Sequence, residues 1–210
     1  MKFLIIPVTP YQQNCTLLWC EATRRAALVD PGGEPARLLA AIAENHLQLD
    51  YLLLTHGHLD HVGTAGELAE HLAIPIIGPH QADDYWLDDL PGQAARFGWP
   101  HVAALKPDRW LNDGDRVLIG NETLDVFHTP GHTPGHVVFF HPPSRVAMVG
   151  DVLFQGAVGR TDFPGGSQAA LLASIREKLW PLGDDVTFIP GHGPTSTFGE
   201  ERRGNPYVRD

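Results

Sequence analysis

The chain has 210 residues, of which 43% are apolar and 19% charged, a composition typical of one globular domain with a hydrophobic core and not of a disordered chain. Its formal net charge of −10, from 15 basic and 25 acidic residues, argues against general nucleic-acid binding, because the phosphate backbone requires Lys and Arg. The first apolar run ends at Pro7, too early for a signal peptide, and no stretch approaches the ~20 apolar residues of a membrane helix. Cys15 and Cys20 lack the spacing of a metal or redox pair, so we expect reduced, buried thiols in a cytoplasmic protein that does not bind membranes.

Short apolar segments predict strands along most of the chain. In the first part they cover residues 2–8, 16–19, 26–29, 51–54 and 74–77. In the second part they cover residues 117–119, 123–127, 137–140, 146–149 and 186–189.

Helical spacing of apolar residues predicts helices over residues 34–46, 64–72 and 168–179. Residues 79–107 are predicted to form a helix followed by a long loop. Strands at both ends of the chain with helices between them predict an α/β fold, in which helices pack outside two sheets.

The histidines point to function. There are twelve, and the first cluster is His56-Gly57-His58-Leu59-Asp60-His61, directly after a predicted buried strand. Imidazole and carboxylate groups are ligands for Zn²⁺, Fe and Mn²⁺. One ion takes three or four protein ligands, so four candidates in six residues indicate more than one ion. Gly57 is expected to make room where backbone and metals approach each other.

Three later segments repeat one pattern, an apolar strand followed by Gly beside His or Asp. They contain His132, Asp151 and His192. A lone loop histidine is usually polar surface, and a lone Asp after a strand is usually a cap or a turn residue. The four segments together, each at a strand end, favour a metal centre over that structural interpretation. His128 and His136, which flank His132, are expected to hold the loop by hydrogen bonds.

These motifs, with Asp30 after the early strand, resemble the metallo-β-lactamase superfamily along nearly the whole chain. The resemblance implies an αββα sandwich of two mixed sheets flanked by helices. It implies two divalent metal ions, with Zn²⁺ as the first expectation and Fe or Mn also compatible. The implied ligands of one ion are His56, His58 and His132, those of the other are Asp60, His61 and His192, and Asp151 would bridge the two. Asp30, Thr55 and His136 are candidates for hydrogen bonds that fix the imidazole tautomers.

Within the superfamily, residues 150–154, 159–164 and 196–206 resemble the short, single-domain bacterial type of glyoxalase II-like hydroxyacylglutathione hydrolases. Larger members carry a helical C-terminal domain for glutathione. This chain ends shortly after His192, so we expect residues 1–210 to be a single metallo-hydrolase domain without it. Where the family places a Lys and a Tyr beside the thiol, this chain has Arg160 and Asp162, and Arg160 is the expected partner of a substrate carboxylate.

The implied reaction is hydrolysis of a small-molecule thioester, with S-D-lactoylglutathione giving D-lactate and glutathione. A water between the two cations would lose a proton near neutral pH and attack the carbonyl, and Asp60 would orient the resulting hydroxide as well as bind metal.

Other functions of the same residues remain open. Persulfide dioxygenases share the fold and use one iron, whose ligands would correspond to His56, His132 and Asp151. Another hydrolase, such as a lactonase or a phosphodiesterase, would use the whole ligand set. A non-catalytic metal protein is disfavoured, because structural zinc sites are closed and usually have four ligands.

Overall fold

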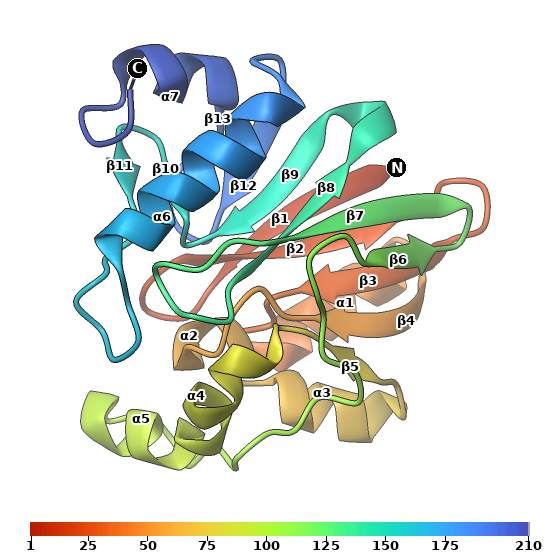
Figure 1. The fold of residues 1–210 in the computed structure, drawn as a ribbon. Helices are drawn as coiled ribbons and strands as arrows, with labels where there is room; N and C mark the ends of the chain where they lie inside the picture. The colour runs from red at the N-terminus through yellow and green to blue at the C-terminus, as the bar shows by residue number, and fades with distance from the viewer. Residues whose placement is uncertain (210) are drawn as a thin grey trace.

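Two sheets face each other in the computed structural model, which describes residues 1–209, and helices cover both outer faces (Figure 1). The first sheet has the strand order β1-β2-β3-β4-β5 and the second the order β13-β12-β9-β8-β7-β6. Each combines parallel and antiparallel pairs. The expected α/β sandwich of two mixed sheets flanked by helices is therefore confirmed.

The first sheet comes from the N-terminal part of the chain. Its strands are β1 (Lys2–Val8), β2 (Gln13–Trp19), β3 (Arg25–Val29), β4 (Gln48–Leu53) and β5 (Ile76–Ile77). β1, β2 and β3 are antiparallel neighbours, and β4 and β5 add in parallel after helical crossovers. Parallel neighbours need such crossovers, which places helices on the outer face.

The second sheet comes from the C-terminal part. Its strands are β6 (Arg116–Ile119), β7 (Glu122–His128), β8 (Val137–His141), β9 (Val146–Gly150), β12 (Thr187–Pro190) and β13 (Ser196–Thr197). A separate small hairpin, β10 (Leu153–Phe154) with β11 (Ala157–Val158), leaves the sheet directly after β9.

Alternation along the strands divides the apolar residues between three cores. In β3, Ala27 and Val29 face the second sheet, whereas Leu28 packs under the helices of the first sheet. In β8, Phe139 lies between the sheets and Phe140 lies under the C-terminal helices. Strands buried on both faces read as continuous apolar runs, which is why the sequence reveals them as strands but not their facing.

Helices form the two outer layers. Those of the first half are α1 (Pro35–Glu44), α2 (Leu59–Val62), α3 (Ala65–Leu72), α4 (Asp84–Asp88) and α5 (Leu90–Phe97), with the 3-10 turn η1 (Gln81–Asp83). The second half has η2 (Pro142–Ser144), α6 (Gln168–Ser174), the π-helical turn η3 (Ile175–Leu179), η4 (Trp180–Leu182) and α7 (Phe198–Gly204). α6 begins where the Ser167 side chain accepts a hydrogen bond from the backbone N–H of Ala170, an N-cap.

The main strands and the three helices occupy the predicted regions. Residues 79–107 differ in detail: η1, α4 and α5 precede an irregular segment that continues to β6. The short elements α2, β10, β11, β13 and α7 were not predicted. Cys15 and Cys20 are buried and unpaired, as expected. Among residues 1–209, no helix has the length and hydropathy needed to cross a membrane.

Candidate metal centre

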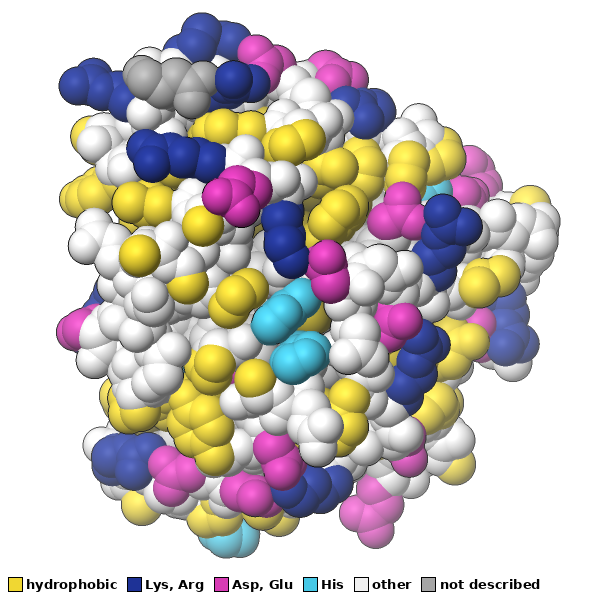
Figure 2. All heavy atoms as spheres, viewed as in Figure 1, with side chains coloured by type: hydrophobic (Ala, Val, Ile, Leu, Met, Phe, Trp, Pro, Cys, Tyr) yellow, Lys and Arg dark blue, Asp and Glu magenta, His cyan; other side chains and the backbone are white. Residues whose placement is uncertain are grey.

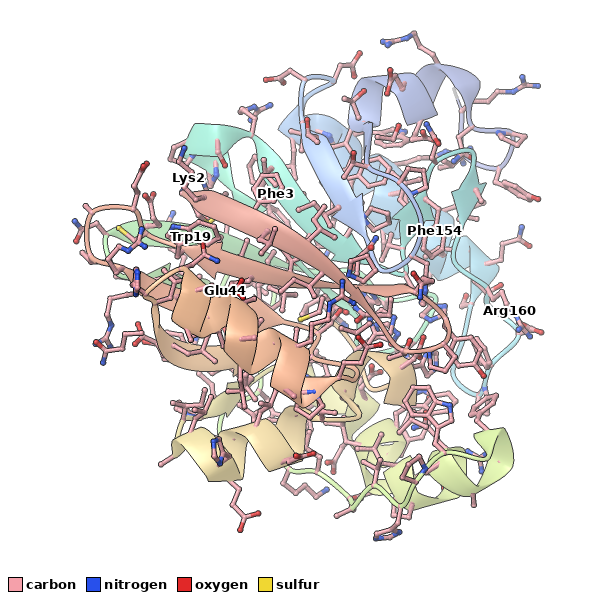
Figure 3. All side chains as sticks on the ribbon, turned by 180° about the vertical axis from the view of Figure 1, so that it is seen from behind. Lys2, Phe3, Trp19, Glu44, Phe154 and Arg160 are labelled. Atoms are coloured by element: carbon pink, nitrogen blue, oxygen red, sulfur yellow. The ribbon has the colours of Figure 1, made fainter. Side chains whose placement is uncertain are left out.

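The predicted ligands lie in loops that leave four strands at the same end of the sandwich. The loop after β4 carries the first cluster, the β7–β8 loop carries His132, and Asp151 and His192 follow β9 and β12. Figure 3 shows Phe154 and Arg160, two residues of the adjoining pocket, on the side of the molecule away from Lys2 and Trp19. Ligands 136 residues apart in the chain (192 − 56) therefore meet because strands of two different sheets end together.

Three imidazoles form the first group. His58 Nδ1 lies 3.1 Å from His56 Nε2 and 3.0 Å from His132 Nε2, and all three side chains are buried. These three nitrogens lie within 4.8 Å of one another, so a single cation could touch them all.

The second group combines Asp60, His61 and His192. Asp60 Oδ2 lies 3.2 Å from His192 Nε2 and 3.9 Å from His61 Nε2. Asp151 lies between the groups: its Oδ1 is 3.3 Å from His61 Nε2, and its Oδ2 is 3.6 Å from His132 Nε2. The structure thus brings all seven predicted ligands together, in the grouping that the resemblance implies.

The donor atoms fit divalent cations. His61 Nε2 and Asp151 Oδ1 are buried without a hydrogen-bond partner, a costly arrangement for polar atoms in a protein interior. Both atoms face the other ligands, and a cation at this position would satisfy them. Imidazole nitrogens and carboxylate oxygens suit Zn²⁺, Fe and Mn²⁺ alike.

The surroundings divide the two groups electrostatically. In the first, burial and the neighbouring imidazoles hold the pKa of His56 well below its usual range and lower that of His58 to about 3. Burial lowers the pKa of His132 also. These imidazoles are neutral at pH 7, which leaves their lone pairs free for metal.

In the second group the carboxylates dominate. Burial opposes the charge on His61, but Asp151 and Asp60 raise its pKa well above the usual value. Burial also opposes the charge on His192, and its hydrogen bond with Asp60 raises its pKa. Burial disfavours the Asp151 carboxylate, yet His61 and the other imidazoles hold its pKa well below the usual range. The second group thus combines imidazoles that favour the positive charge with carboxylates that favour the negative charge.

Asp30 connects the two ligand groups through hydrogen bonds. Its Oδ2 accepts hydrogen bonds from His61 Nδ1 at 2.8 Å and from the Thr55 hydroxyl at 2.6 Å. Since that hydroxyl donates to Asp30, its oxygen is free to accept from His56 Nδ1, 2.9 Å away. Because these hydrogen bonds occupy Nδ1 of His56 and His61, Nε2 of each ring is the nitrogen left to bind a metal ion.

Backbone carbonyls orient two other ligands. His132 Nδ1 donates to the Arg160 carbonyl at 2.8 Å, and His192 Nδ1 donates to the Tyr11 carbonyl at 3.0 Å. His58 is the exception, because it presents Nδ1 to the group while its buried Nε2 has no hydrogen-bond partner and its ring packs edge-on against Trp86.

His136 has the structural role expected for it. Its Nε2 accepts from the Asp151 backbone N–H at 3.1 Å and its Nδ1 donates to Thr129 Oγ1 at 3.2 Å. Both ring nitrogens are therefore occupied. His128 Nε2 likewise donates to the Pro134 carbonyl, 2.8 Å away.

Asp83 is a supporting residue that sequence reasoning missed. It is fully buried and accepts hydrogen bonds from Gly57 N at 3.0 Å, Thr133 Oγ1 at 2.7 Å and Gly135 N at 2.6 Å. One carboxylate therefore ties the loop of His56 and His58 to the loop of His132. No motif surrounds Asp83, and it lies in an acidic segment beside Asp84, so nothing in the sequence distinguishes it from a surface residue.

The reason predicted for Gly57 was wrong. A Cβ at this position would lie 2.6 Å from Trp86 Cβ. The glycine therefore lets helix α4 pack closely against this loop, and it does not make room for a metal ion. Gly191 does make room at the centre, because a Cβ there would lie 2.0 Å from Asp151 Oδ1.

Arg160 lines the pocket above the centre, but its guanidinium is turned to solvent. Its side chain is 69% exposed and pairs with Asp162, with Nη2 2.8 Å from Oδ2. It also lies over the Phe163 ring, 4.6 Å from the centroid.

Comparison with known proteins places this geometry in a family. Residues 8–192 match the profile of the metallo-beta-lactamase superfamily. The chain belongs to this superfamily. It is 49% identical over 209 residues to hydroxyacylglutathione hydrolase GloC of Haemophilus influenzae, covering 99% of this chain and 98% of that protein.

Solved structures agree. BLEG-1 B3 metallo-beta-lactamase superposes with a TM-score of 0.91 at 37% identity, over 100% of both chains. The di-iron-bound form of TTHA1623 gives 0.89 at 37% identity, over 98% of this chain and 100% of that one. The chain is thus a metal-dependent hydrolase of the glyoxalase II-like type, and the His/Asp groups are suited to divalent metals.

Proposed function

We propose that this chain hydrolyses acyl thioesters, with S-D-lactoylglutathione as the leading substrate, at a site that holds two divalent cations. The observation that carries the proposal is the pair of three-residue ligand groups on either side of Asp151, at the base of one pocket. The 49% identity to a hydroxyacylglutathione hydrolase supports the substrate class. We propose further that residues 1–210 act as a single catalytic domain.

His56, His58 and His132 would hold one cation, Asp60, His61 and His192 would hold the other, and Asp151 would bridge them. When bound, such cations polarise the acyl carbonyl and lower the pKa of water toward neutrality. Zn²⁺ is our first choice. Iron remains an alternative, because these ligands accept both metals and the TTHA1623 structure is described as di-iron-bound.

Asp60 is the residue best placed to hold the attacking water. It lines the pocket, its side chain is 22% exposed, and only its Oδ2 lies beside the His192 imidazole, at 3.2 Å. A carboxylate has about four acceptor positions, so lone pairs remain to accept a hydrogen bond from water in the pocket. Asp60 would thereby direct the water oxygen toward the acyl carbon.

The reaction balances without a further catalytic group. The water oxygen bonds to the acyl carbon as the C–S bond breaks, and the sulfur leaves with the bonding electron pair. Of the two water protons, one ends on the thiol and the other is released when the carboxylic acid product ionises. Tyr85 lies nearby, but its hydroxyl donates to the Pro164 carbonyl at 2.6 Å, and burial together with Asp83 raises its pKa to about 12. Tyr85 therefore holds the loop and does not supply a proton.

Hydrolysis of S-D-lactoylglutathione by the metal-loaded protein tests the proposal. We expect one thiol released per thioester lost, abolition by a chelator, and recovery when Zn²⁺ or Fe²⁺ is returned. Absence of thiol release from every acyl thioester, at full metal occupancy, would refute it.

Oxidation of a persulfide by a single iron is the second candidate. His56, His132 and Asp151 are all present, with His132 Nε2 3.6 Å from Asp151 Oδ2. This alternative leaves Asp60, His61 and His192 without a metal ion to bind, although they form a ligand group of their own. Oxygen consumption with glutathione persulfide, measured beside thioester hydrolysis, distinguishes the two functions.

A further inference from the structure

The pocket above the metal centre is large and mostly apolar, with a volume of about 890 Å³. Part of its lining adjoins the first ligand group and part adjoins the second. The first part holds Arg160 and Phe163, whose ring packs against His58 and His132, with centroids 4.8 and 5.6 Å apart. Figure 3 shows Arg160 at the outer edge of the molecule here.

The second part is formed by three aromatic side chains, Tyr11, Phe97 and Trp99, which we call the aromatic wall. The rings of Tyr11 and Trp99 are nearly parallel, with centroids 6.0 Å apart and planes 16° apart, and Phe97 meets Tyr11 edge-on at 6.4 Å. At these distances the rings contact one another and form one continuous surface, not a cage.

The aromatic wall adjoins the second ligand group. The Tyr11 carbonyl accepts the hydrogen bond from His192 Nδ1. Trp99 lies beside Gly63 at the end of α2, the helix that carries Asp60 and His61: a Cβ on Gly63 would lie 3.4 Å from the Trp99 ring.

Two of the three rings are exposed although they are apolar, and Trp99 is half-buried against the core of the first sheet. Tyr11 is 50% and Phe97 56% exposed, so a ligand that covers them would remove substantial apolar surface from water. Contiguous exposed apolar surface in a pocket usually marks a binding site.

The charges of the pocket favour a neutral ligand in this part. Arg96, which precedes Phe97 in α5 and also lines the pocket, is paired with Asp89. Elsewhere, Figure 2 shows basic and acidic side chains interspersed over one face of the molecule. An anionic group would therefore gain little beside the wall, whereas an apolar group would gain contact with three rings.

We propose that the aromatic wall binds the acyl group of the substrate and extends the acyl groups that the enzyme accepts from lactoyl to aromatic and branched apolar ones; this inference rests on the proposed thioester hydrolysis. A thioester has two arms, the acyl and the thiol part, that diverge from the reacting carbonyl. With the carboxylate-bearing thiol arm directed to Arg160, the acyl arm points to Tyr11, Phe97 and Trp99.

The test compares S-lactoyl-, S-isovaleryl- and S-phenylacetylglutathione in the metal-loaded wild type and in Trp99→Ala and Phe97→Ala. Dividing each variant's kcat/KM by the wild-type value for the same substrate cancels the intrinsic reactivity of the thioester. Phe97 lies exposed at the end of α5, so Phe97→Ala should fold even if Trp99→Ala does not. Tyr207→Ala is the matched control, since Tyr207 is 57% exposed and not among the residues that line the pocket.

For phenylacetyl we expect a loss of about 10-fold in Trp99→Ala and about 3-fold in Phe97→Ala, with lactoyl changed by less than about 2-fold. Tyr207→Ala should match wild type. Equal losses for all acyl groups, or no loss, would overturn the role of the wall while leaving thioester hydrolysis intact. A series of lactoyl thioesters of different thiols is the second arm, and a variant effect confined to that series would overturn the acyl assignment. Failure of the wild type on every thioester would instead refute the proposed function.

Discussion

Replacement of Asp83 by alanine should destabilise the metal-free protein, although Asp83 belongs to neither ligand group. The carboxylate accepts from two backbone N–H groups, those of Gly57 and Gly135, and from the Thr133 hydroxyl. The hydroxyl can rotate toward another partner, but the two N–H groups cannot. Asp83→Ala leaves both of them buried and unsatisfied.

The magnitude follows from the bonds and from the charge. Each buried, unsatisfied N–H costs about 1–3 kcal/mol, so the pair predicts a loss of about 2–6 kcal/mol. Burial makes the charged form of the Asp83 carboxyl unfavourable. It raises the pKa of Asp83 from 3.8 to about 6 despite the hydrogen bonds from Thr133, Gly135 and Gly57. A carboxyl with a raised folded-state pKa stabilises the fold most below pH 3.8 and loses that contribution as pH rises through about 6. The destabilisation by Asp83→Ala should therefore be larger at pH 5 than at pH 7, by about 1 kcal/mol.

Urea unfolding of the metal-free proteins at both pH values measures this difference, with Asp84→Ala as the matched control. Asp84 is the neighbouring acidic residue, but it lies at the surface beside Lys106, where ion pairs contribute about 0–1 kcal/mol. A loss below about 1 kcal/mol for Asp83→Ala at pH 5, or a larger loss at pH 7, would refute the reasoning.

Three further predictions concern the centre itself. Asp151→Ala should lower kcat/KM by at least about 100-fold together with the metal bound per chain, because Asp151 contacts both ligand groups; two ions retained on elemental analysis would contradict a bridging role. Arg160→Ala should raise KM by less than about 5-fold and leave kcat nearly unchanged, since an exposed, paired guanidinium contributes little and only to binding; an equal fall in kcat would place Arg160 in the chemical step. On acidification, the second ligand group should lose its metal ion at a higher pH than the first. The pKa values of His61 and His192 are raised, whereas those of the first group are lowered, so protons displace metal from the second group earlier. Simultaneous loss of both ions in a pH titration of metal content would contradict this prediction.

The ligands could be predicted from the sequence because each belongs to a local pattern. His56, His132, Asp151 and His192 each follow an apolar strand, and strand ends gather in space when the sheets stack. Asp83 has no such pattern. Its three partners lie 26, 50 and 52 residues away, and only the packing of η1 against the two loops brings them together.

The aromatic wall was unpredictable for a related reason. Phe97 and Trp99 lie in the stretch that was predicted only as a helix with a following loop, and Tyr11 lies in the β1–β2 turn. Tyr11 and Trp99 lie outside helices and strands, where no periodicity reveals which side chains face a pocket, and Phe97 is the last residue of α5. Substrate selection therefore depends on the part of the chain where sequence patterns are weakest.

The C-terminal tail shows a recognisable motif whose role appears only in three dimensions. Glu201 Oε2 accepts from the Gly156 N–H at 2.7 Å and from Asn205 Nδ2 at 2.9 Å, and Asn205 Nδ2 also donates to the Ala157 carbonyl at 3.0 Å. These bonds fasten α7 to the β10–β11 hairpin, which carries Phe154 over the pocket, 6.4 Å from the His192 ring. A buried carboxylate with matched donors specifies one geometry, because any other would leave polar groups unsatisfied. Asp83 and Glu201 thus have similar structural roles. Each is a buried carboxylate whose hydrogen bonds fix the conformation of a loop that the loop's own sequence does not specify.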